Sequence, residues 1–486
     1  MGNTPYMQEQ QRLRRTKIVA TLGPATDDPR VIEQMIAAGL DVVRINFSHG
    51  DAADHIRRVN MVRECAQKHD REVGVLADLQ GPKIRIDRFS AGPIRLEEGD
   101  AFILDANCPP DAGSQQRVGI TYKTLPDDVN AGDVLLLDDG NIVLNVEKIS
   151  DREIHCRVVV GGQLSNNKGI NRQGGGLSAA ALTDKDRIDV KTAAEVDADY
   201  VAISFPRNAA DIHEARELLR QAGGHGGIVA KIERAESLNG IEDIIAASDV
   251  IMIARGDLGV EIGDAELPGV QKRLIQLARS MNRVVITATQ MMQSMVEHHI
   301  PTRAEVFDVA NAVLDGTDAV MLSEETAAGN YPVKAVEAMD RVCRGAETQK
   351  VVLRSRHRVN TEFTHIDEAI AMATMYTANH LGVRAIAALT ESGMTAQWMS
   401  RISSGIPIYA MTRHVNARRR MTLYRGVYPV DFDVTVAQQQ DGGNQAVISE
   451  LLAHGTVQKG DLVIITMGDV AGVHGGTNTM KIVRVN

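Results

Sequence analysis

Eight short apolar segments alternate with amphipathic stretches through most of this chain, and this alternation limits the folds it can adopt. The apolar segments are almost continuously hydrophobic, which is typical of parallel strands buried on both faces. The predicted strands are residues 17–22, 42–47, 73–79, 200–205, 228–233, 250–255, 284–289 and 318–323. The predicted helices are residues 29–39, 52–69, 184–195, 209–221, 236–247, 268–282, 302–315 and 333–343. Eight strands, each followed by a helix, indicate an α/β fold of the (β/α)8 TIM barrel type.

An open, doubly wound sheet is the alternative to this barrel. No glycine-rich dinucleotide fingerprint follows the first predicted strand, so the barrel is favoured. With 486 residues the chain is also too long for one hydrophobic core, and its length suggests about three domains.

The connection between the third strand and its helix differs from the others. Residues 86–177 show strand-like alternation, a turn signal at Asp139 and Gly140, and the glycine-rich segment GGQLSNNKGINRQGGG. We expect a small β-barrel domain inserted at the C-terminal face of the barrel. Such a domain can act as a lid that excludes water from reactive intermediates.

The last third of the chain predicts a separate α/β domain. Its expected helices are residues 366–381 and 444–452, and its expected strands are residues 385–389, 407–411, 462–466 and 481–485. The predicted division is an N-terminal tail at 1–15, the barrel at 16–85 and 178–346, the lid at 86–177 and the C-terminal domain at 347–486.

Composition argues against several classes of partner. Aromatic residues make up 3% of the chain and its net charge is −10, which disfavours nucleic acid. No apolar run approaches the roughly 18 residues needed to cross a bilayer, so no membrane partner is expected. The four cysteines are far apart and form no metal or disulfide pattern. These features predict a cytoplasmic protein.

Charged and hydroxyl side chains follow nearly every predicted strand, at the barrel edge where active sites lie. The segments are RINFSHG at 44–50, DLQGPKIR at 78–85, KIE at 231–233, ARGD at 254–257, TQ at 289–290 and SEET at 323–326. Glu233 and Asp257 offer hard oxygen ligands that suit Mg²⁺ or Mn²⁺. Arg44, Arg85 and Lys231 suit phosphoryl oxygens. Metal-binding carboxylates beside cations, without a Ser/His/Asp set, indicate phosphoryl transfer.

Several longer segments resemble the pyruvate kinase family. They are TKIVATLGPAT, VVRINFSHG, KIE, ARGDLGVEI, ITATQMM, PTRAEVFDVANAVLDGTDAVMLSEETAAGNYP and TNTMKI, and the similarity runs from about Thr16 to the C-terminus. The resemblance implies an enzyme of glycolysis that moves a phosphoryl group from phosphoenolpyruvate to ADP, giving pyruvate and ATP. It also implies a homotetramer.

The resemblance also implies roles for the strand-end residues. Glu233 and Asp257 would ligate the divalent metal, Lys231 would neutralise the transferred phosphoryl group and the developing enolate, and Arg44 would hold the phosphate.

Further roles concern the substrate carboxylate and proton transfer. Gly256 and Asp257 would offer backbone N–H groups to the carboxylate, which Thr289 would also contact. A water near Thr289 and Ser323 would protonate enolpyruvate. The residues implied along the nucleotide phosphates are Asn46, Ser48, His49, Arg85 and Lys168.

One segment departs from the family pattern, at the monovalent-cation pocket of Asn46, Ser48, Asp78 and Lys83. Potassium-dependent members usually carry Asp-Thr-Lys-Gly-Pro-Glu, where this chain has DLQGPK. Our hypothesis is that the Lys83 ammonium takes the place of K⁺, so that no monovalent cation is required. The alternative is an ordinary solvated or paired lysine.

In the C-terminal domain, the segment LTESGMTA at 389–396 follows a strand and opens a helix. Hydroxyls and N–H groups there could bind phosphate. The family uses this loop for a sugar phosphate or a nucleotide monophosphate. The predicted effector residues are Thr390, Ser392, Gly393 and Thr395, and residues 470–476 would complete the pocket.

Simpler structural roles and other functions stay open at this point. Lys231 and Glu233 could be an ion pair at a strand end, Ser48 could cap a helix, and the loop at 389–396 could serve only as a cap. The competing functions are a metal-dependent aldolase or carboxylase on the same barrel and a non-catalytic regulator that binds sugar phosphates.

Overall fold

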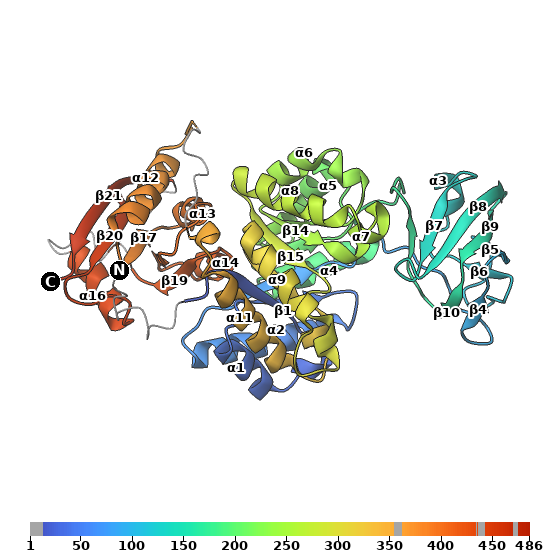
Figure 1. The fold of residues 1–486 in the computed structure, drawn as a ribbon, viewed down its shortest axis with the longest axis horizontal. Helices are drawn as coiled ribbons and strands as arrows, with labels where there is room; N and C mark the ends of the chain where they lie inside the picture. The colour runs from blue at the N-terminus through green and yellow to red at the C-terminus, as the bar shows by residue number, and fades with distance from the viewer. Residues whose placement is uncertain (1–12, 354–361, 434, 436–442, 470–474) are drawn as a thin grey trace.

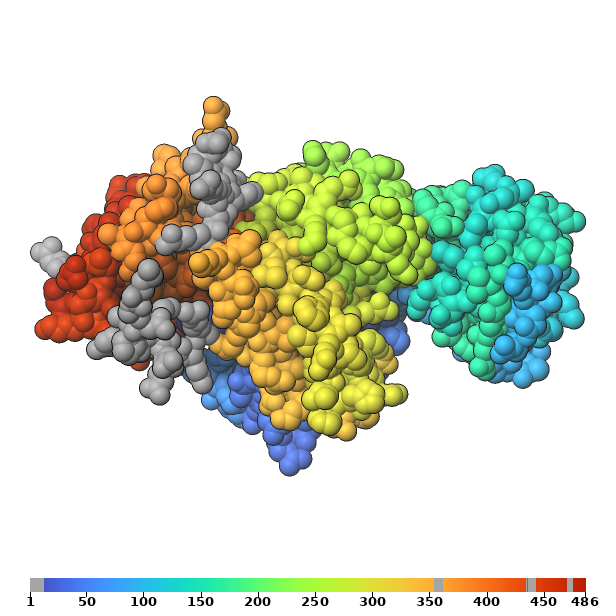
Figure 2. Space-filling model, in the orientation of Figure 1, coloured from blue at the N-terminus to red at the C-terminus, as the bar shows by residue number. Residues whose placement is uncertain are grey.

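The computed structural model describes residues 13–353, 362–433, 435, 443–469 and 475–486. Figure 1 shows three bodies in a row, with a barrel in the centre, a C-terminal α/β domain on one side and a sheet-rich domain on the other. The space-filling view in Figure 2 shows the sheet-rich domain projecting from the barrel, away from the C-terminal domain. No helix of the described residues is long and apolar enough to cross a membrane.

Eight parallel strands form a closed barrel in the order β1-β16-β15-β14-β13-β12-β3-β2. The strands are β1 (Lys17–Thr21), β2 (Val42–Asn46), β3 (Gly74–Asp78), β12 (Tyr200–Ile203), β13 (Gly227–Ile232), β14 (Val250–Ala254), β15 (Val284–Ala288) and β16 (Ala319–Leu322). The pairing of β1 with β16, in which Lys17 lies opposite Ala319, closes the ring. The predicted barrel is therefore confirmed, and the open sheet is wrong.

Both faces of each barrel strand are buried, which explains why the strands are so uniformly apolar. In β1, Ile18 and Ala20 pack in the core between strands and helices, whereas Val19 packs in the second core inside the ring. Because neither face meets water, no polar alternation is needed.

The predicted helices around the barrel are present, together with two short helices that were not predicted, at Arg255–Ile262 and Glu324–Ala327. They are α1 (Pro29–Ala37), α2 (Ala52–Lys68), α4 (Asp184–Glu195), α5 (Ala209–Gln221), α6 (Ile241–Ala247), α7 (Arg255–Ile262), α8 (Leu267–Ser280), α9 (Arg303–Asp315), α10 (Glu324–Ala327) and α11 (Pro332–Ala346). Short 3-10 turns occur at η2 (Pro24–Thr26), η3 (Glu236–Leu238), η4 (Gln293–Val296) and η5 (Lys350–Val352). The helix predicted at 236–247 is divided, because Gly240 separates η3 from α6.

The insertion after β3 forms sheets with a core of their own. A six-stranded sheet has the order β11-β7-β8-β9-β5-β6, and a two-stranded sheet joins β10 to β4. The elements are β4 (Ile94–Leu96), β5 (Ala101–Asp105), β6 (Arg117–Gly119), α3 (Leu125–Asp128), β7 (Val134–Leu137), β8 (Ile142–Ser150), β9 (Glu153–Val160), β10 (Gly162–Leu164) and β11 (Ile170–Arg172). The predicted turn at Asp139 and Gly140 joins β7 to β8, with φ of 55° and 90° at these residues. The predicted β lid domain is thus present.

The C-terminal domain is built on a five-stranded sheet with the order β19-β18-β17-β20-β21. Its elements are α12 (Ile366–Leu381), β17 (Ala385–Leu389), α13 (Met394–Ser400), β18 (Ile408–Thr412), α14 (Val415–Met421), β19 (Val427–Asp431), α16 (Gly443–Ala453), β20 (Leu462–Gly468) and β21 (Thr477–Arg484). The four predicted strands are confirmed. Strand β19 was not predicted, because Pro429 disfavours a central strand; it is tolerated at this edge.

The C-terminal domain covers the barrel end opposite the lid. The core inside the ring continues into this domain through Met421 and Tyr424. Lys17 Nζ, at the start of β1, donates to the Val427 carbonyl at 2.6 Å. The rim from which the lid rises, at the end of β3, is therefore the barrel face left for a site.

A buried ion pair crosses the boundary between the barrel and the C-terminal domain. Arg401, which is fully buried, donates from Nη1 to Asp318 Oδ2 at 2.9 Å. Asp318 Oδ2 also accepts from the Val285 N–H at 2.9 Å. Removing the arginine would leave a buried carboxylate without its cation, which is more costly than losing an exposed pair.

We expect Arg401→Met to lower the free energy of unfolding by about 3–5 kcal/mol, because it strands the Asp318 charge. Urea unfolding followed by circular dichroism measures this. The matched control is Arg157→Met, which removes an exposed pair and should change stability far less than Arg401→Met does. The double variant Arg401→Met with Asp318→Asn should recover part of the loss. Equal stability of the Arg401 and Arg157 variants would contradict this role.

Candidate active site

The predicted strand-end residues meet on one rim of the barrel. Asp78 ends β3, Lys231 lies in β13, and Asp257 lies in the first turn of α7, which starts directly after β14. Parallel strands in a closed ring bring their C-terminal ends to one edge, so residues far apart in sequence become neighbours.

Asp78 lies at the centre of the charged groups and is 1% exposed. Its Oδ2 lies 2.6 Å from Arg44 Nε, and its Oδ1 lies 3.3 Å from Lys231 Nζ. Burial acts to raise the pKa of Asp78, but Lys231 and Arg44 outweigh this effect and hold the pKa below its usual value. Asp78 is therefore an ionised carboxylate that positions two cations.

Lys231 contacts acidic and hydroxyl groups from three strands. Besides Asp78, its Nζ contacts Glu233 Oε1 at 2.9 Å and Ser204 Oγ at 2.7 Å. Burial acts to lower the pKa of Lys231, but Asp78 and Glu233 raise it above its ordinary value. The side chain is thus a fixed ammonium group. The ion pair with Glu233, which the sequence left open as a structural role, is present as part of this set.

Glu233 and Asp257 provide the oxygen donors of a candidate metal centre. Glu233 is 2% exposed, and its Oε2 accepts from the Phe205 N–H at 2.8 Å. Burial raises the pKa of Glu233, Lys231 opposes the rise, and the charge of Asp257 adds to it. A divalent cation between the two carboxylates would relieve both the burial cost and their mutual repulsion. This donor set therefore fits Mg²⁺ or Mn²⁺.

Protein ligands alone do not complete this centre. Among the described residues, no group of three or more His, Cys, Asp or Glu side chains could hold a metal. Mg²⁺ commonly binds to one or two carboxylates and takes its other ligands from substrate and water. Two carboxylates are the number expected for such a centre.

Thr289 joins the end of β15 to the start of α7. Its Oγ1 accepts from the Gly256 N–H at 2.8 Å and donates to the Ala288 carbonyl at 2.7 Å. Its φ of 68° is unusual for a residue other than glycine. Arg255 stabilises this conformation by donating from Nη2 to the Thr289 carbonyl at 2.7 Å.

Ser323 precedes the short helix α10 on the neighbouring strand end. Its N–H donates to Glu325 Oε2 at 2.7 Å, and Glu325 Oε1 accepts from the Met292 N–H at 3.1 Å. Glu325, which is fully buried, therefore joins the loop after β16 to the loop after β15.

The predicted nucleotide residues fall into two separate groups. Asn46 Oδ1 accepts from the Ser48 N–H, and the Asn46 carbonyl accepts from the His49 N–H, so these residues form one turn after β2. Asp51 caps α2, so the interpretation of Ser48 as the cap is wrong. Arg85 and Lys168 lie where the lid joins the barrel, with Arg85 Nη1 2.9 Å from the Asn167 carbonyl and Lys168 Nζ 2.6 Å from Asp138 Oδ1.

Lys83 lies on the metal side of the site. Its Nζ is 3.2 Å from Asp257 Oδ1. The hydrogen bonds and ion pairs of the described residues do not link Lys83 to Asn46, Ser48 or Asp78, the other members of the predicted monovalent-cation pocket. Asp78 is instead held by Arg44 and Lys231.

Ser204 is a residue of the candidate site that the sequence analysis missed. It follows β12, is 1% exposed, accepts from Lys231 and donates to the Leu79 carbonyl at 2.7 Å. The sequence could have identified Ser204, because it lies at the end of a predicted strand in the same way as the site residues that were predicted. Thr21 was missed in the same way; its Oγ1 accepts from Arg44 Nη1 at 3.1 Å.

The predicted effector loop leads into α13, whose N-cap residue, Gly393, has a φ of 85° and provides no side-chain cap. The Gly393 N–H donates to Thr390 Oγ1 at 2.9 Å, and the Met394 N–H contacts Ser392 Oγ at 3.4 Å. Thr395 Oγ1 lies 2.7 Å from Thr477 Oγ1 on β21. The predicted remainder of this pocket, at 470–474, lies outside the described residues.

Comparisons with known proteins agree with this geometry. A family model described as "Pyruvate kinase, barrel domain" matches residues 13–336, and one described as "Pyruvate kinase, alpha/beta domain" matches residues 368–483. Pyruvate kinase II of Salmonella typhimurium is 57% identical over 479 residues, covering 98% of this chain and 99% of that protein. The pyruvate kinase of Haemophilus influenzae is 55% identical over 462 residues, covering 94% and 96%. That of Mycobacterium intracellulare is 42% identical over 477 residues, covering 97% and 98%.

Gly81 provides a test of the contact between Ser204 and Lys231. It has a φ of 66°, and a Cβ atom at this position would lie 2.6 Å from Ser204 Cβ. We expect Gly81→Ala to displace Ser204 and misplace the Lys231 ammonium, lowering turnover by about 10²-fold. The matched control is Gly92→Ala, which has a φ of 86° and no atom within 4 Å of the added Cβ. Similar turnover of the two variants in a steady-state assay would show that Ser204 does not position Lys231.

Proposed function

Because this chain belongs to the pyruvate kinase family and is a phosphotransferase of glycolysis, we propose that it moves a phosphoryl group from phosphoenolpyruvate to ADP with Mg²⁺ or Mn²⁺, giving pyruvate and ATP. The observation that carries the proposal is the placing of the Lys231 ammonium between Asp78 and Glu233, on the rim that also holds Asp257. A fixed cation beside paired carboxylates is suited to phosphoryl transfer.

Arg44 and Lys231 would bind the phosphoryl group of the substrate. Arg44 contacts Asp78 through Nε and keeps N–H donors for phosphoryl oxygens. The three N–H groups of Lys231 face Asp78, Glu233 and Ser204, so Lys231 would exchange one of these partners for a phosphoryl oxygen. Glu233 and Asp257 would hold the metal, which would supply charge neutralisation of substrate oxygens. Lys231 would also stabilise the enolate oxygen that develops as the phosphorus–oxygen bond breaks and the phosphoryl group passes to ADP.

The start of α7 would bind the substrate carboxylate. The Gly256 N–H, which donates to Thr289 Oγ1, would exchange this partner for a carboxylate oxygen, and the Asp257 N–H would be a second donor. Thr289 would then be free to contact the carboxylate or a water. A water between Thr289 and Ser323 would give a proton to the methylene carbon of enolpyruvate, which completes pyruvate.

The lid would complete the nucleotide site. Lys168 and Arg85, at the joint between lid and barrel, would approach the ADP phosphates, with Asn46, Ser48 and His49 on the barrel side. Closure of the lid would exclude water, which otherwise could accept the phosphoryl group in place of ADP.

Other proposals concern regulation, assembly and location. We infer that a sugar phosphate or nucleotide effector binds at Thr390, Ser392, Gly393 and Thr395, supported by the convergence of hydroxyls at the start of α13.

From the family we also infer a homotetramer in the cytoplasm. We propose a barrel at 16–85 and 178–346, a lid at 86–177 and an effector domain at 347–486.

A metal-dependent aldolase or carboxylase would use similar carboxylates, but it would not need the lid lysine. A coupled assay with phosphoenolpyruvate and ADP separates these reactions, because only the phosphotransferase makes ATP. Pyruvate release without ATP would overturn the proposed function.

The proposed role of Lys231 predicts the effect of removing its charge. We expect Lys231→Met to lower kcat by about 10²–10³-fold or more, because one preorganised charge is lost from the transition state. The control is Lys68→Met, which removes an exposed lysine and should leave kcat unchanged. A kcat within about threefold of the parent, in a variant that binds substrate, would refute the role.

We also propose that no monovalent cation is required, because Lys83 provides a fixed positive charge beside Asp257. Activity in K⁺-free tetramethylammonium buffer should be close to that with KCl. Lys83→Glu should lose activity in K⁺-free buffer and regain part of it with KCl. Activation of the parent by KCl of roughly tenfold or more would contradict this proposal.

A further inference from the structure

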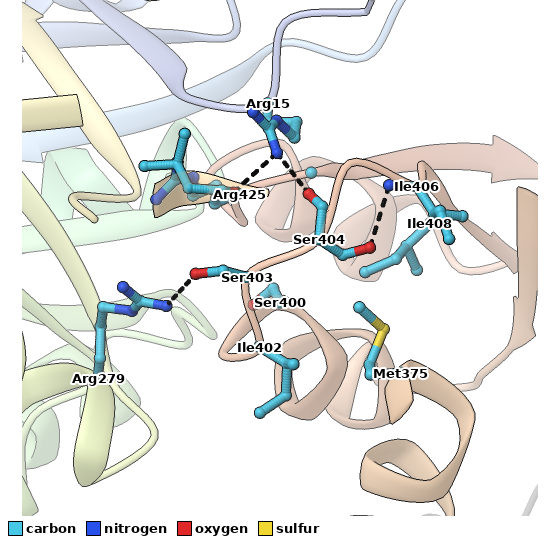
Figure 3. Close-up of a pocket in the computed structure, with 12 residues that line it drawn as sticks. Arg15, Arg279, Met375, Ser400, Ile402, Ser403, Ser404, Ile406, Ile408 and Arg425 are labelled. Atoms are coloured by element: carbon cyan, nitrogen blue, oxygen red, sulfur yellow. Dashed lines mark hydrogen bonds between the residues drawn. The ribbon is translucent and has the colours of Figure 1, made fainter. Parts of the chain in front are cut away.

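A small cavity of about 20 Å³ lies between the barrel and the C-terminal domain. Figure 3 shows Arg15, Arg279 and Arg425 on its walls. Ser403 faces Arg279, and Ser404 faces Arg15. Arg279 ends α8 of the barrel and Arg15 precedes β1, whereas Arg425 and the two serines belong to the C-terminal domain. The cavity is far from the substrate rim, because the C-terminal domain covers the opposite barrel end.

The carboxylates near this cavity are already engaged. Glu347 accepts from the backbone N–H groups of Arg15 and Thr16 and lies 3.5 Å from Arg15 Nε. Asp318 is paired with Arg401 and also accepts from the Val285 N–H. These two acids balance Arg15 and Arg401.

Arg279 and Arg425 are the cations in excess. Arg279 donates to neutral groups, the Arg401 carbonyl at 3.0 Å and Ser403 Oγ at 3.2 Å. Arg425 is 7% exposed, and among the described residues Nη1 and Nη2 of its guanidinium have no hydrogen-bond partner. Neither side chain forms an ion pair with a carboxylate of the described residues.

Burying the charges of Arg279 and Arg425 is unfavourable when only the surrounding protein groups are present. Burial lowers the pKa of Arg279 to about 10 and also lowers that of Arg425; neighbouring arginines add to both effects, and the charges of Glu347 and Asp318 oppose them without reversing them. A buried charge is stabilised only by a counter-charge and hydrogen bonds. The arrangement therefore calls for a negative charge between the arginines.

We propose that this cavity binds a compact monovalent anion of the size of chloride, contacted by Arg15, Arg279 and Arg425. About 20 Å³ accommodates one or two occupants of the size of a water molecule, which is too little for a phosphate group. Ser403 Oγ accepts from Arg279, so its hydroxyl hydrogen is available to the anion. The anion would add an electrostatic link across the boundary that Arg401 and Asp318 already join.

Anion-dependent stability tests this proposal on the full-length protein. Replacing sodium gluconate with sodium chloride at equal ionic strength should raise the Tm by on the order of 2 °C. Arg425→Met should remove this response and raise the Tm measured in gluconate, because the unpaired charge is gone. The matched control is Arg30→Met, an exposed residue, which should keep the full chloride response.

Two outcomes would overturn the proposal: an equal chloride response of the parent and Arg425→Met, or no chloride response of the parent. If Arg425→Met does not fold, Arg279→Met serves as the second variant and should also lose the response. Crystals grown with sodium bromide should show an anomalous peak between the three guanidinium groups. Absence of that peak at saturating bromide would equally reject the site.

Discussion

Closure of the barrel by the pairing of β1 with β16 is the constraint on which the rest of the structure depends. It removes the exposed edges of the sheet and buries both faces of every strand. It also brings the ends of eight strands to one rim, so that charged groups from distant parts of the chain must lie within a few ångströms of one another. Each charged group at a strand end must then lie beside a group of opposite charge, and this requirement sets the arrangement of charges on the rim.

Asp78 shows how this compensation produces a site. A buried carboxylate at the end of β3 is acceptable only with cations; the adjacent strand β2 supplies Arg44, and β13, beyond β12, supplies Lys231. The same contacts hold both cations at the rim. The ion-pair network and the proposed phosphoryl site are therefore one structure, and the structural and catalytic interpretations of Lys231 do not exclude each other.

The sequence predicted the strands and helices better than it predicted which side chains pair with one another. The barrel strand ranges agree within one or two residues, because a buried apolar run is a local signal, whereas β21 begins at Thr477 rather than at residue 481. Helix α7 was not predicted; its segment RGDLGVEI contains two glycines and forms a helix through tertiary contacts, such as those of the fully buried Leu258. Lys83 was expected near Asp78 but pairs with Asp257, because its partner depends on where α7 lies. Pairings of this kind are set by three-dimensional distance, which residue spacing does not contain.

The balance of charge differs between the two polar regions of the molecule. On the rim, Arg44, Lys231 and Lys83 face Asp78, Glu233 and Asp257, so three cations meet three carboxylates. A divalent metal alone would add uncompensated positive charge there, and an anionic substrate alone would add negative charge beside buried carboxylates. The two are most favourable together, so we expect metal and substrate to bind with positive coupling. At the domain boundary two arginines have no acidic partner among the described residues, and there the proposed anion would compensate part of the excess charge without a metal.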